Sequence, residues 1–269
     1  MRPNRLRELR GRGETAVSAW VSCDSAHVAE VLSHAGYDAV TVDLQHGMFG
    51  LDGAVALLRA VSAGPAVPMA RCSRLDPAEI GKLLDAGAYG IICPSVDSAA
   101  QCAEFVAACR YPPTGRRSFG PARGLLYGGP DYVAGADGTV QAWAMVESRA
   151  SLDALDDILA VPGLDGVYVG PNDLALSLGA VPPAGGFAPE VDEALVRVLD
   201  RAHAAGVAAG AYCPDGASAR RLASAGFDLV TPGNDVVLLK ESAERRIAET
   251  RGNGTAGTTS GIPRTGDGY

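Results

Sequence analysis

Acidic, imidazole and guanidinium side chains follow several predicted β-strands in this sequence, and together they could hold a cation and move a proton. Residues 39–47 read Ala-Val-Thr-Val-Asp-Leu-Gln-His-Gly, an alternating strand that ends at Asp43, Gln45 and His46. Arg71, Glu147 and the run Gly170-Pro171-Asn172-Asp173 end strands further along the chain. A single polar residue at a strand end often only meets solvent, but its recurrence over several strands favours a shared site.

The two acids Glu147 and Asp173 have no cysteine or histidine at metal-ligand spacing, which suits a hard, oxygen-preferring ion such as Mg²⁺ or Mn²⁺. Such an ion leaves coordination positions for a chelating 2-oxo acid and would stabilise the enolate formed at its C3. Arg71 is suited to holding the negative oxygen, and His46 can exchange protons near neutral pH.

Each of these residues also has a simpler explanation that the sequence leaves open. Glu147 could be a strand-end acid that faces water, and Asp173 could cap the helix that begins near Leu174. Arg71 could be a structural ion-pair partner of Asp43 or Asp85.

The scarcity of lysine favours an enolate held by a metal over a Schiff base. Only Lys82 and Lys240 occur, against twenty-one arginines, and neither ends a predicted strand. A Schiff-base aldolase needs a lysine that projects into its site.

An internal repeat organises the elements that must position these side chains. Residues 32–41, 84–92 and 222–231 each end a helix with Ala-Gly, turn through an aromatic residue and an Asp or Gly, and enter a β-branched strand. Residues 161–169 are a looser fourth copy. The glycine supplies a left-handed helix C-cap, and the short loop returns the next strand alongside its predecessor.

The chain therefore alternates strands and helices around eight predicted strands: Ala16–Val21, Ala39–Leu44, Ala66–Cys72, Gly90–Pro94, Val140–Glu147, Gly166–Gly170, Val207–Cys213 and Leu229–Thr231. We expect an α/β fold, a single (β/α)₈ TIM barrel whose strand ends meet at one rim. An open doubly wound sheet is the alternative, but no strand is followed by G-x-G-x-x-G or a Walker loop. Expected helix N-caps are Asp24, Asp76, Ser98 and Asp215, with a capping box over residues 76–79.

Composition narrows the class of protein. Apolar residues at 47% and charged residues at 20% describe a globular chain, and a net charge of -8 argues against nucleic acid as a partner. No apolar run reaches the length of a membrane span, and no apolar segment follows the arginine-rich start as in a secretory signal. The six cysteines show no pairing motif and suggest reduced thiols in the cytoplasm.

The two ends and one connection depart from the alternation. The arginine-rich first twelve residues fit a short amphipathic helix, with an organellar transit peptide as the weaker alternative. The connection over residues 111–132 is rich in Pro, Gly and Arg, and loops of this length are usually functional or disordered. We expect the barrel over residues 1–250 and a flexible glycine-rich tail over 251–269.

Four segments together give the sequence a resemblance to the HpcH/HpaI family of class II pyruvate aldolases over roughly residues 4–248. They are residues 37–47, Tyr-Asp-Ala-Val-Thr-Val-Asp-Leu-Gln-His-Gly; residues 84–88, Leu-Asp-Ala-Gly-Ala; residues 111–117, Tyr-Pro-Pro-Thr-Gly-Arg-Arg; and residues 166–174, Gly-Val-Tyr-Val-Gly-Pro-Asn-Asp-Leu. The resemblance implies a phosphoenolpyruvate/pyruvate-type barrel, usually a homohexamer, that cleaves or forms 4-hydroxy-2-oxo acids from pyruvate and an aldehyde.

The resemblance also implies roles for single residues. Glu147 and Asp173 would bind the divalent metal (Mg²⁺, Mn²⁺ or Co²⁺), and His46 would be the general base. Arg71 would stabilise the transition state, and Asp85 would raise the basicity of the histidine. The segment Gly170, Pro171, Asn172 and Asp173 would hold the substrate carboxylate through its backbone.

The sequence departs from the family pattern near the site. Gln45 replaces an acid often found before the histidine, and Met145 stands where many members carry a substrate-binding glutamine. Residues 119–127 also differ, which leaves the identity of the aldehyde substrate open.

Three hypotheses for the function follow. They are a metal-dependent aldolase, a decarboxylase or acyl-CoA lyase that uses the same enolate, and a barrel that binds carboxylates without catalysis.

Overall fold

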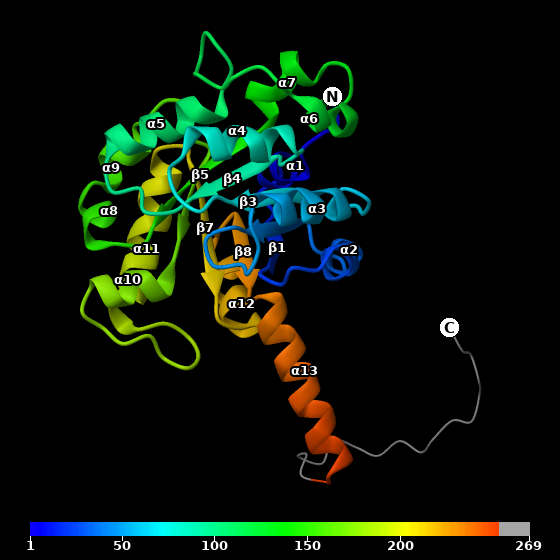
Figure 1. The fold of residues 1–269 in the computed structure, drawn as a ribbon. Coiled ribbons are helices and arrows are strands. Elements are labelled where there is room, and N and C mark those ends of the chain that lie inside the picture. The colour runs from blue at the N-terminus through cyan, green and yellow to red at the C-terminus, as the bar shows by residue number, and fades with distance from the viewer. Residues whose placement is uncertain (253–269) are drawn as a thin grey trace. The chain divides into compact units, whose positions relative to one another are not determined.

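A closed barrel of eight parallel strands forms the first of two compact units in this computed structural model, which describes residues 1–252 (Figure 1). The strands are β1 (Ala16–Val21), β2 (Ala39–Asp43), β3 (Val67–Arg71), β4 (Gly90–Cys93), β5 (Gln141–Val146), β6 (Gly166–Val169), β7 (Ala208–Cys213) and β8 (Leu229–Pro232). Each strand pairs with the next, and β8 pairs with β1. The expected barrel is confirmed, with strand bounds within one residue of those predicted, and the open sheet is excluded.

The helices complete the alternation: α1 (Arg5–Gly11), α2 (Ala26–His34), α3 (Leu51–Val61), α4 (Pro77–Asp85), α5 (Ala99–Cys109), α6 (Ala122–Gly128), α7 (Tyr132–Thr139), α8 (Arg149–Asp153), α9 (Leu155–Leu159), α10 (Pro171–Ser177), α11 (Pro189–Ala204), α12 (Gly216–Ala225) and α13 (Asp235–Thr250). The first unit covers Met1–Asp235 and the second begins at Val236, so α13 belongs almost wholly to the second. The predicted glycine-rich tail lies outside the described residues from position 253 onward. No helix among residues 1–252 has the length and hydropathy needed to cross a membrane.

Strand alternation divides the core into two parts. Val40 and Val42 point outward to the helices, whereas Trp20, Met69 and Trp143 fill the barrel interior. Because side chains alternate along a strand, Asp43 and Arg71 also point inward at the last positions of β2 and β3.

The repeat seen in the sequence closes the amino-terminal end of the barrel. Its aspartates each use one carboxylate oxygen to accept the N–H of a neighbouring strand: Asp38 from Val17 at 3.0 Å, Asp165 from Ala142 at 2.8 Å, and Asp228 from Ala209 at 2.8 Å. A carboxylate in this position satisfies a strand N–H that would otherwise lack a partner.

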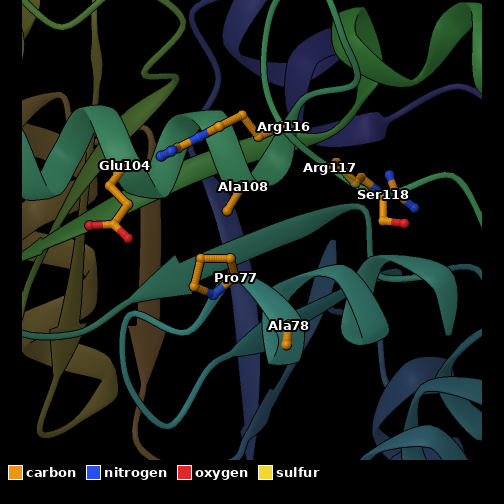
Figure 2. A pocket seen from close by; sticks show the side chains of 7 residues that line it. All are labelled: Pro77, Ala78, Glu104, Ala108, Arg116, Arg117 and Ser118. Carbon is orange, nitrogen blue, oxygen red and sulfur yellow. The ribbon is translucent and has the colours of Figure 1, made fainter.

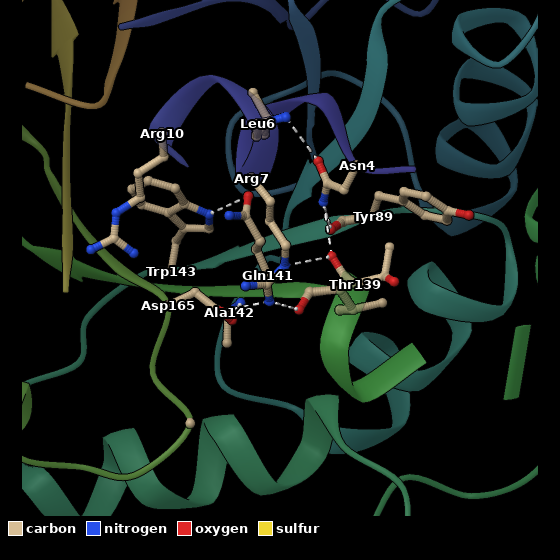
Figure 3. A network of polar contacts seen from close by, with 12 residues as sticks. Asn4, Leu6, Arg7, Arg10, Tyr89, Thr139, Gln141, Ala142, Trp143 and Asp165 are labelled. Atoms are coloured by element: carbon tan, nitrogen blue, oxygen red, sulfur yellow. Dashed lines mark hydrogen bonds and ion pairs between the residues drawn. The ribbon is translucent and has the colours of Figure 1, made fainter. Parts of the chain in front are cut away.

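Helix α1 binds the other oxygens of the same aspartates. Arg5 reaches Asp38 at 2.7 Å, Arg7 reaches Asp165 at 2.7 Å, and Arg10 lies 3.7 Å from Asp228. Figure 3 shows Arg7 and Asn4 among the neighbouring backbone carbonyls, including that of Thr139. Leu6 and Leu9 of α1 are buried against the interior, each contributing about 1.5–3 kcal/mol. The arginine-rich start is therefore a plug for the barrel.

Two local expectations need correction. The N-cap of α2 is Ser25, whose hydroxyl accepts the N–H of Val28, rather than Asp24. Asp76 caps α4 as expected, but Glu79 does not complete a capping box, because its carboxylate binds the N–H and hydroxyl of Ser73.

The long connection over 111–132 is ordered rather than structureless. It contains α6, and the guanidinium of Arg117 lies between the rings of Tyr111 and Tyr132, at 4.5 and 5.4 Å. These ring contacts link positions too far apart in sequence to show a local pattern.

Candidate active site

The carboxyl ends of the strands bring most of the expected residues to one rim. Asp43 and Arg71 are partners in adjacent strands, with their Cα atoms in register. Glu147 directly follows β5, and Gly170 directly follows β6, which pairs with β5 through Val146 and Val169. Segments separated by more than a hundred residues in sequence therefore meet because the sheet is closed and parallel.

Asp43 and Arg71 form a buried ion pair. Arg71 donates from Nε to Oδ1 at 2.8 Å and from Nη2 to Oδ2 at 2.6 Å, and Trp20 Nε1 donates to Oδ2 at 3.1 Å. Burial alone would raise the pKa of Asp43, but the hydrogen bonds and charge of Arg71 lower it overall. The pair fixes the guanidinium, and within residues 1–252 no hydrogen-bond partner takes its Nη1 group.

Aromatic rings lie beneath this ion pair. The guanidinium of Arg71 stands 4.9 Å from the ring of Trp20, which stacks on Tyr168 at 5.7 Å and meets Tyr212 edge-on at 6.1 Å. The charges of Arg71 and Asp43 both influence the pKa of the Tyr212 hydroxyl, which burial raises. The floor of the site is therefore aromatic and rigid.

Glu147 has one carboxylate oxygen bound and one free of partners. Oε1 accepts the backbone N–H of Ser95 at 2.6 Å, whereas Oε2 is buried without a hydrogen-bond partner among the described residues. The residue is only 7% exposed. A buried carboxylate oxygen left bare in this way is costly unless a ligand completes it.

Asp173 lies in the first turn of α10, close enough to act on Glu147. Burial raises the pKa of Glu147, the N–H of Ser95 lowers it, the charge of Asp173 raises it further, and Arg71 lowers it. The capping role considered for Asp173 is not seen, because α10 already begins at Pro171 and its N-cap is Gly170.

Gly170 leaves space where a larger residue would press on Glu147. A Cβ at this position would lie 2.8 Å from Glu147 Oε2 and 2.9 Å from Met145 Cε. The Met145 side chain therefore reaches the same place from the barrel interior. It puts a thioether, rather than a hydrogen-bond donor, beside the bare oxygen.

These residues fit a hard divalent cation. Among residues 1–252, no group of three His, Cys, Asp or Glu side chains is gathered at metal-ligand spacing. Two carboxylates plus water and substrate oxygens are a usual set for Mg²⁺, which keeps several waters. The bare, buried oxygen of Glu147 beside the charge of Asp173 is the feature that supports such an ion.

His46 lies on the rim with an exposed side chain. Its backbone N–H and that of Gln45 both donate to Oδ1 of Asp43, at 3.3 and 3.1 Å. The Asp43 carboxylate that pairs with Arg71 therefore also fixes the backbone of the turn that carries His46.

Asp85 does not lie at the rim with His46. It is the last residue of α4, which runs back from the carboxyl end of β3 toward the amino end of β4. Its carboxylate accepts Nη2 of Arg117 at 2.6 Å. Its expected effect on the histidine stays a prediction, because the contact that the structure gives its carboxylate is with Arg117.

A separate cavity of about 360 Å³ lies outside the barrel, between α4, α5 and the loop that carries Arg116 and Arg117 (Figure 2). Pro77, Ala78, Glu104, Ala108 and Ser118 complete its lining. None of the strand-end residues lines it, so it is not the site described above.

Two further residues belong to the site but carried no functional signal in the sequence. Trp20 and Tyr212 look like ordinary strand aromatics until the barrel closes. Alternate side chains of β1 and β7 point into the barrel, and this alternation could have identified Trp20 and Tyr212. Ser95 directly follows the fourth predicted strand, so its place at the rim was expected, and its contact with Glu147 shows its role there.

Known proteins resemble the chain over almost its full length. The sequence model of the HpcH/HpaI aldolase/citrate lyase family matches residues 17–242. A hydroxypyruvate/pyruvate aldolase from Rhizorhabdus wittichii is 42% identical, and the match covers 92% of this chain and 99% of the relative. A 2-keto-3-deoxy-L-rhamnonate aldolase from Klebsiella pneumoniae is 36% identical, with 88% and 89% covered.

A solved structure agrees with these relatives. The crystal structure of a HpcH/HpaI aldolase/citrate lyase family protein from Burkholderia cenocepacia superposes with a TM-score of 0.86 at 33% identity. The match covers 93% of this chain and all of that one.

Proposed function

This chain belongs to the HpcH/HpaI aldolase/citrate lyase family and is a carbon–carbon lyase, and from that membership we propose that it cleaves or forms a 4-hydroxy-2-oxo acid in a divalent-metal-dependent aldol reaction. The observation that carries the proposal is Oε2 of Glu147, which is buried without a hydrogen-bond partner among residues 1–252, on a carboxylate whose pKa the charge of Asp173 helps to raise. The 2-oxo acid that supplies the enolate is pyruvate or hydroxypyruvate, as in the name of the Rhizorhabdus relative.

Glu147 and Asp173 would hold the ion, which we propose to be Mg²⁺, Mn²⁺ or Co²⁺. When bound, it would supply positive charge to the 2-oxo group as negative charge develops there. Met145 reaches Gly170 from the same side as Glu147, and its thioether has no N–H or O–H to donate, so the protein's donors to the substrate must come from elsewhere.

Arg71 supplies one such donor in a fixed position. Asp43 occupies Nε and one side of the guanidinium, which leaves Nη1 for a developing negative oxygen. A donor held in place before reaction stabilises the transition state without reorganisation.

The start of α10 supplies others. The N–H groups of Asn172 and Asp173 lie in the first turn of the helix, where no carbonyl within the helix can accept them. We assign them, with Gly170 and Pro171, to the substrate carboxylate.

His46 moves the proton. In cleavage it takes the proton of the 4-hydroxyl as the C3–C4 bond breaks, and in the other direction it returns a proton to the alkoxide. Its exposed ring is accessible to an incoming aldehyde, and its backbone is fixed by Asp43.

A Schiff-base mechanism has no residue to carry it at this rim. Lys82 is an exposed residue within α4, and Lys240 lies in α13. Borohydride added with pyruvate should therefore trap no covalent adduct, and a labelled lysine would overturn the metal-dependent assignment.

Deuterium exchange tests the proposal most directly. Pyruvate incubated with the protein and Mn²⁺ in D₂O should exchange its methyl protons, and EDTA should stop the exchange. A metal-supplemented screen of aldehydes, read by product mass, then identifies the second substrate. Turnover of oxaloacetate would indicate the decarboxylase alternative, and turnover of malyl-CoA would indicate the acyl-CoA lyase alternative. Both are compared with turnover of a 4-hydroxy-2-oxo acid by product mass. Absence of exchange with every metal would instead favour a carboxylate-binding protein.

The family resemblance also favours a homohexamer. Mass photometry of the full chain at nanomolar concentration would test this assembly. A monomer would contradict it.

A further inference from the structure

The backbone at Ser95 has a conformation that its residue type does not favour. Its φ is +54°, and it is the only non-glycine residue with positive φ in the part of the chain that the structure describes. Residues other than glycine, asparagine and aspartate adopt this left-handed region reluctantly, because their Cβ crowds the backbone there. Strain of this kind persists where the surrounding structure requires it, and it often marks a functional position.

The left-handed turn directs a hydrogen bond at Glu147. Ser95 follows β4 by two residues, and β4 pairs with β5 through Cys93 and Ala144. The turn sends the Ser95 N–H across to Oε1 of Glu147 at 2.6 Å, and its hydroxyl lies 3.4 Å from the same oxygen. Both donors therefore meet one oxygen, and Oε2 receives neither.

The backbone of Glu147 is held as well. Its N–H donates to the hydroxyl of Ser151 at 3.2 Å, and Ser148 forms the capping box of α8 with the same serine. With the main chain fixed there, the remaining freedom of Glu147 lies in its side chain. The contact with Ser95 removes that freedom.

We infer that Ser95 is a positioning residue: its left-handed backbone binds Oε1 of Glu147 and thereby presents Oε2 alone to a divalent cation. The inference rests on the proposed function, since it needs Glu147 to be a metal ligand. The backbone conformation at Ser95, rather than its hydroxyl, determines which oxygen of Glu147 faces the cation. Partners of this kind typically change metal affinity by about 10–100-fold when they are lost.

Two substitutions separate backbone conformation from side-chain size. Ser95→Asn keeps a residue that tolerates positive φ, whereas Ser95→Val introduces a β-branched side chain that resists it. Ser95 is exposed, so either side chain can extend into solvent. Ser95→Gly and Ser95→Ala complete the set, because both lack the hydroxyl and only glycine relieves the strain.

The readout is the affinity for Mn²⁺ without substrate, measured by electron paramagnetic resonance on the full chain. We expect Ser95→Asn and Ser95→Gly to bind within about threefold of the unaltered protein, and Ser95→Val to bind about 10–100-fold more weakly. Equal binding by Ser95→Val, or equal loss in Ser95→Asn, would overturn the inference. If thermal melting shows that Ser95→Val does not fold, Ser95→Thr replaces it, because it is β-branched but keeps the hydroxyl.

Glu147→Gln separates this inference from the proposed function. If the unaltered protein and Glu147→Gln bind Mn²⁺ equally, Glu147 is not a ligand and both proposals fail. If Glu147→Gln loses the ion while Ser95→Val keeps it, the proposed function stands and only the role of Ser95 is refuted.

Discussion

Arg71 and Asp43 meet through two parallel hydrogen bonds, from Nε to Oδ1 at 2.8 Å and from Nη2 to Oδ2 at 2.6 Å, inside a barrel end that also holds Glu147. The two residues are register partners on adjacent strands, so the sheet itself sets their separation. This arrangement aims a permanent positive charge at the rim and fixes its orientation.

Arg71→Lys should remove that orientation while keeping the charge. A lysine ammonium cannot form the paired bonds to Asp43, so we expect kcat to fall by about 10²–10³ with a smaller change in KM. Steady-state kinetics of the aldol reaction measure both. Arg74→Lys is the control, because Arg74 follows the same strand but is exposed and lies 3.7 Å from Asp76. Equal activity of the two variants would remove Arg71 from the mechanism.

The contribution of Asp43 to the free energy of unfolding should decrease at acidic pH. Its folded-state pKa is lowered, because the contacts with Arg71 outweigh the effect of burial. The ion pair therefore stabilises the fold above the unfolded pKa of about 3.9, and this contribution is lost as pH falls through the folded pKa. The difference in unfolding free energy between the unaltered protein and Asp43→Asn, from urea titrations, should shrink below about pH 4.

Asp156→Asn serves as the matched control for this pH effect. Asp156 also pairs with an arginine, Arg201, but both side chains are more than half exposed. Exposed pairs contribute little, so this substitution should leave stability nearly unchanged over the same pH range. A constant difference for Asp43→Asn down to pH 2 would contradict the assignment.

Glu147→Gln should stabilise the metal-free protein and abolish its response to metal. Burial raises the pKa of Glu147, so its ionised form costs stability, and stability decreases as pH rises through that pKa. Glutamine carries no charge, so the melting temperature without metal should increase at pH 7.5. Addition of Mn²⁺ should raise the melting temperature of the unaltered protein only. A metal-induced increase that survives in Glu147→Gln would place the ion elsewhere.

Gly170→Ala should disturb the same oxygen without backbone strain. The φ of Gly170 is -93°, which alanine accepts, but the added Cβ would lie 2.8 Å from Glu147 Oε2. We expect Mn²⁺ affinity to fall at least about tenfold by calorimetry. Gly81→Ala is the control, because a Cβ there meets nothing within 4 Å. Unchanged affinity in Gly170→Ala would show that Glu147 can move away freely.

His46→Ala should slow proton transfer by about 10²–10⁴-fold, the usual contribution of a general base. The measurement is aldol cleavage under single-turnover conditions, with Mn²⁺ affinity as the check that the site is intact. His34→Ala is the control, since His34 ends α2 away from the rim. Cleavage at the unaltered rate would leave the base unidentified.

The sequence predicted the barrel because its signals were local. The Ala-Gly turns that precede Asp38 and Asp228 mark where helices end, and alternation marks the strands between them. Parallel strands then place Asp43, Arg71, Glu147 and Asp173 at one rim by topology alone.

What the sequence could not show depends on contacts between distant residues. Nothing near Ser95 announces a positive φ, because serine is not a usual residue for that region. The partner of Asp85 is Arg117, in a connection where the Arg117 guanidinium also packs over the rings of Tyr111 and Tyr132. Likewise, Ser73 takes the carboxylate of Glu79 away from the expected capping box.

The plug formed by α1 has a consequence for biosynthesis. Arg5, Arg7 and Arg10 are synthesised before any strand of the barrel, yet Asp228, the partner of Arg10, lies between the last two strands. Arg5 can meet Asp38 early, whereas the ion pair of Arg10 cannot form until residue 228 has also been synthesised. The helix therefore completes its ion pairs late, after seven of the eight strands have been synthesised.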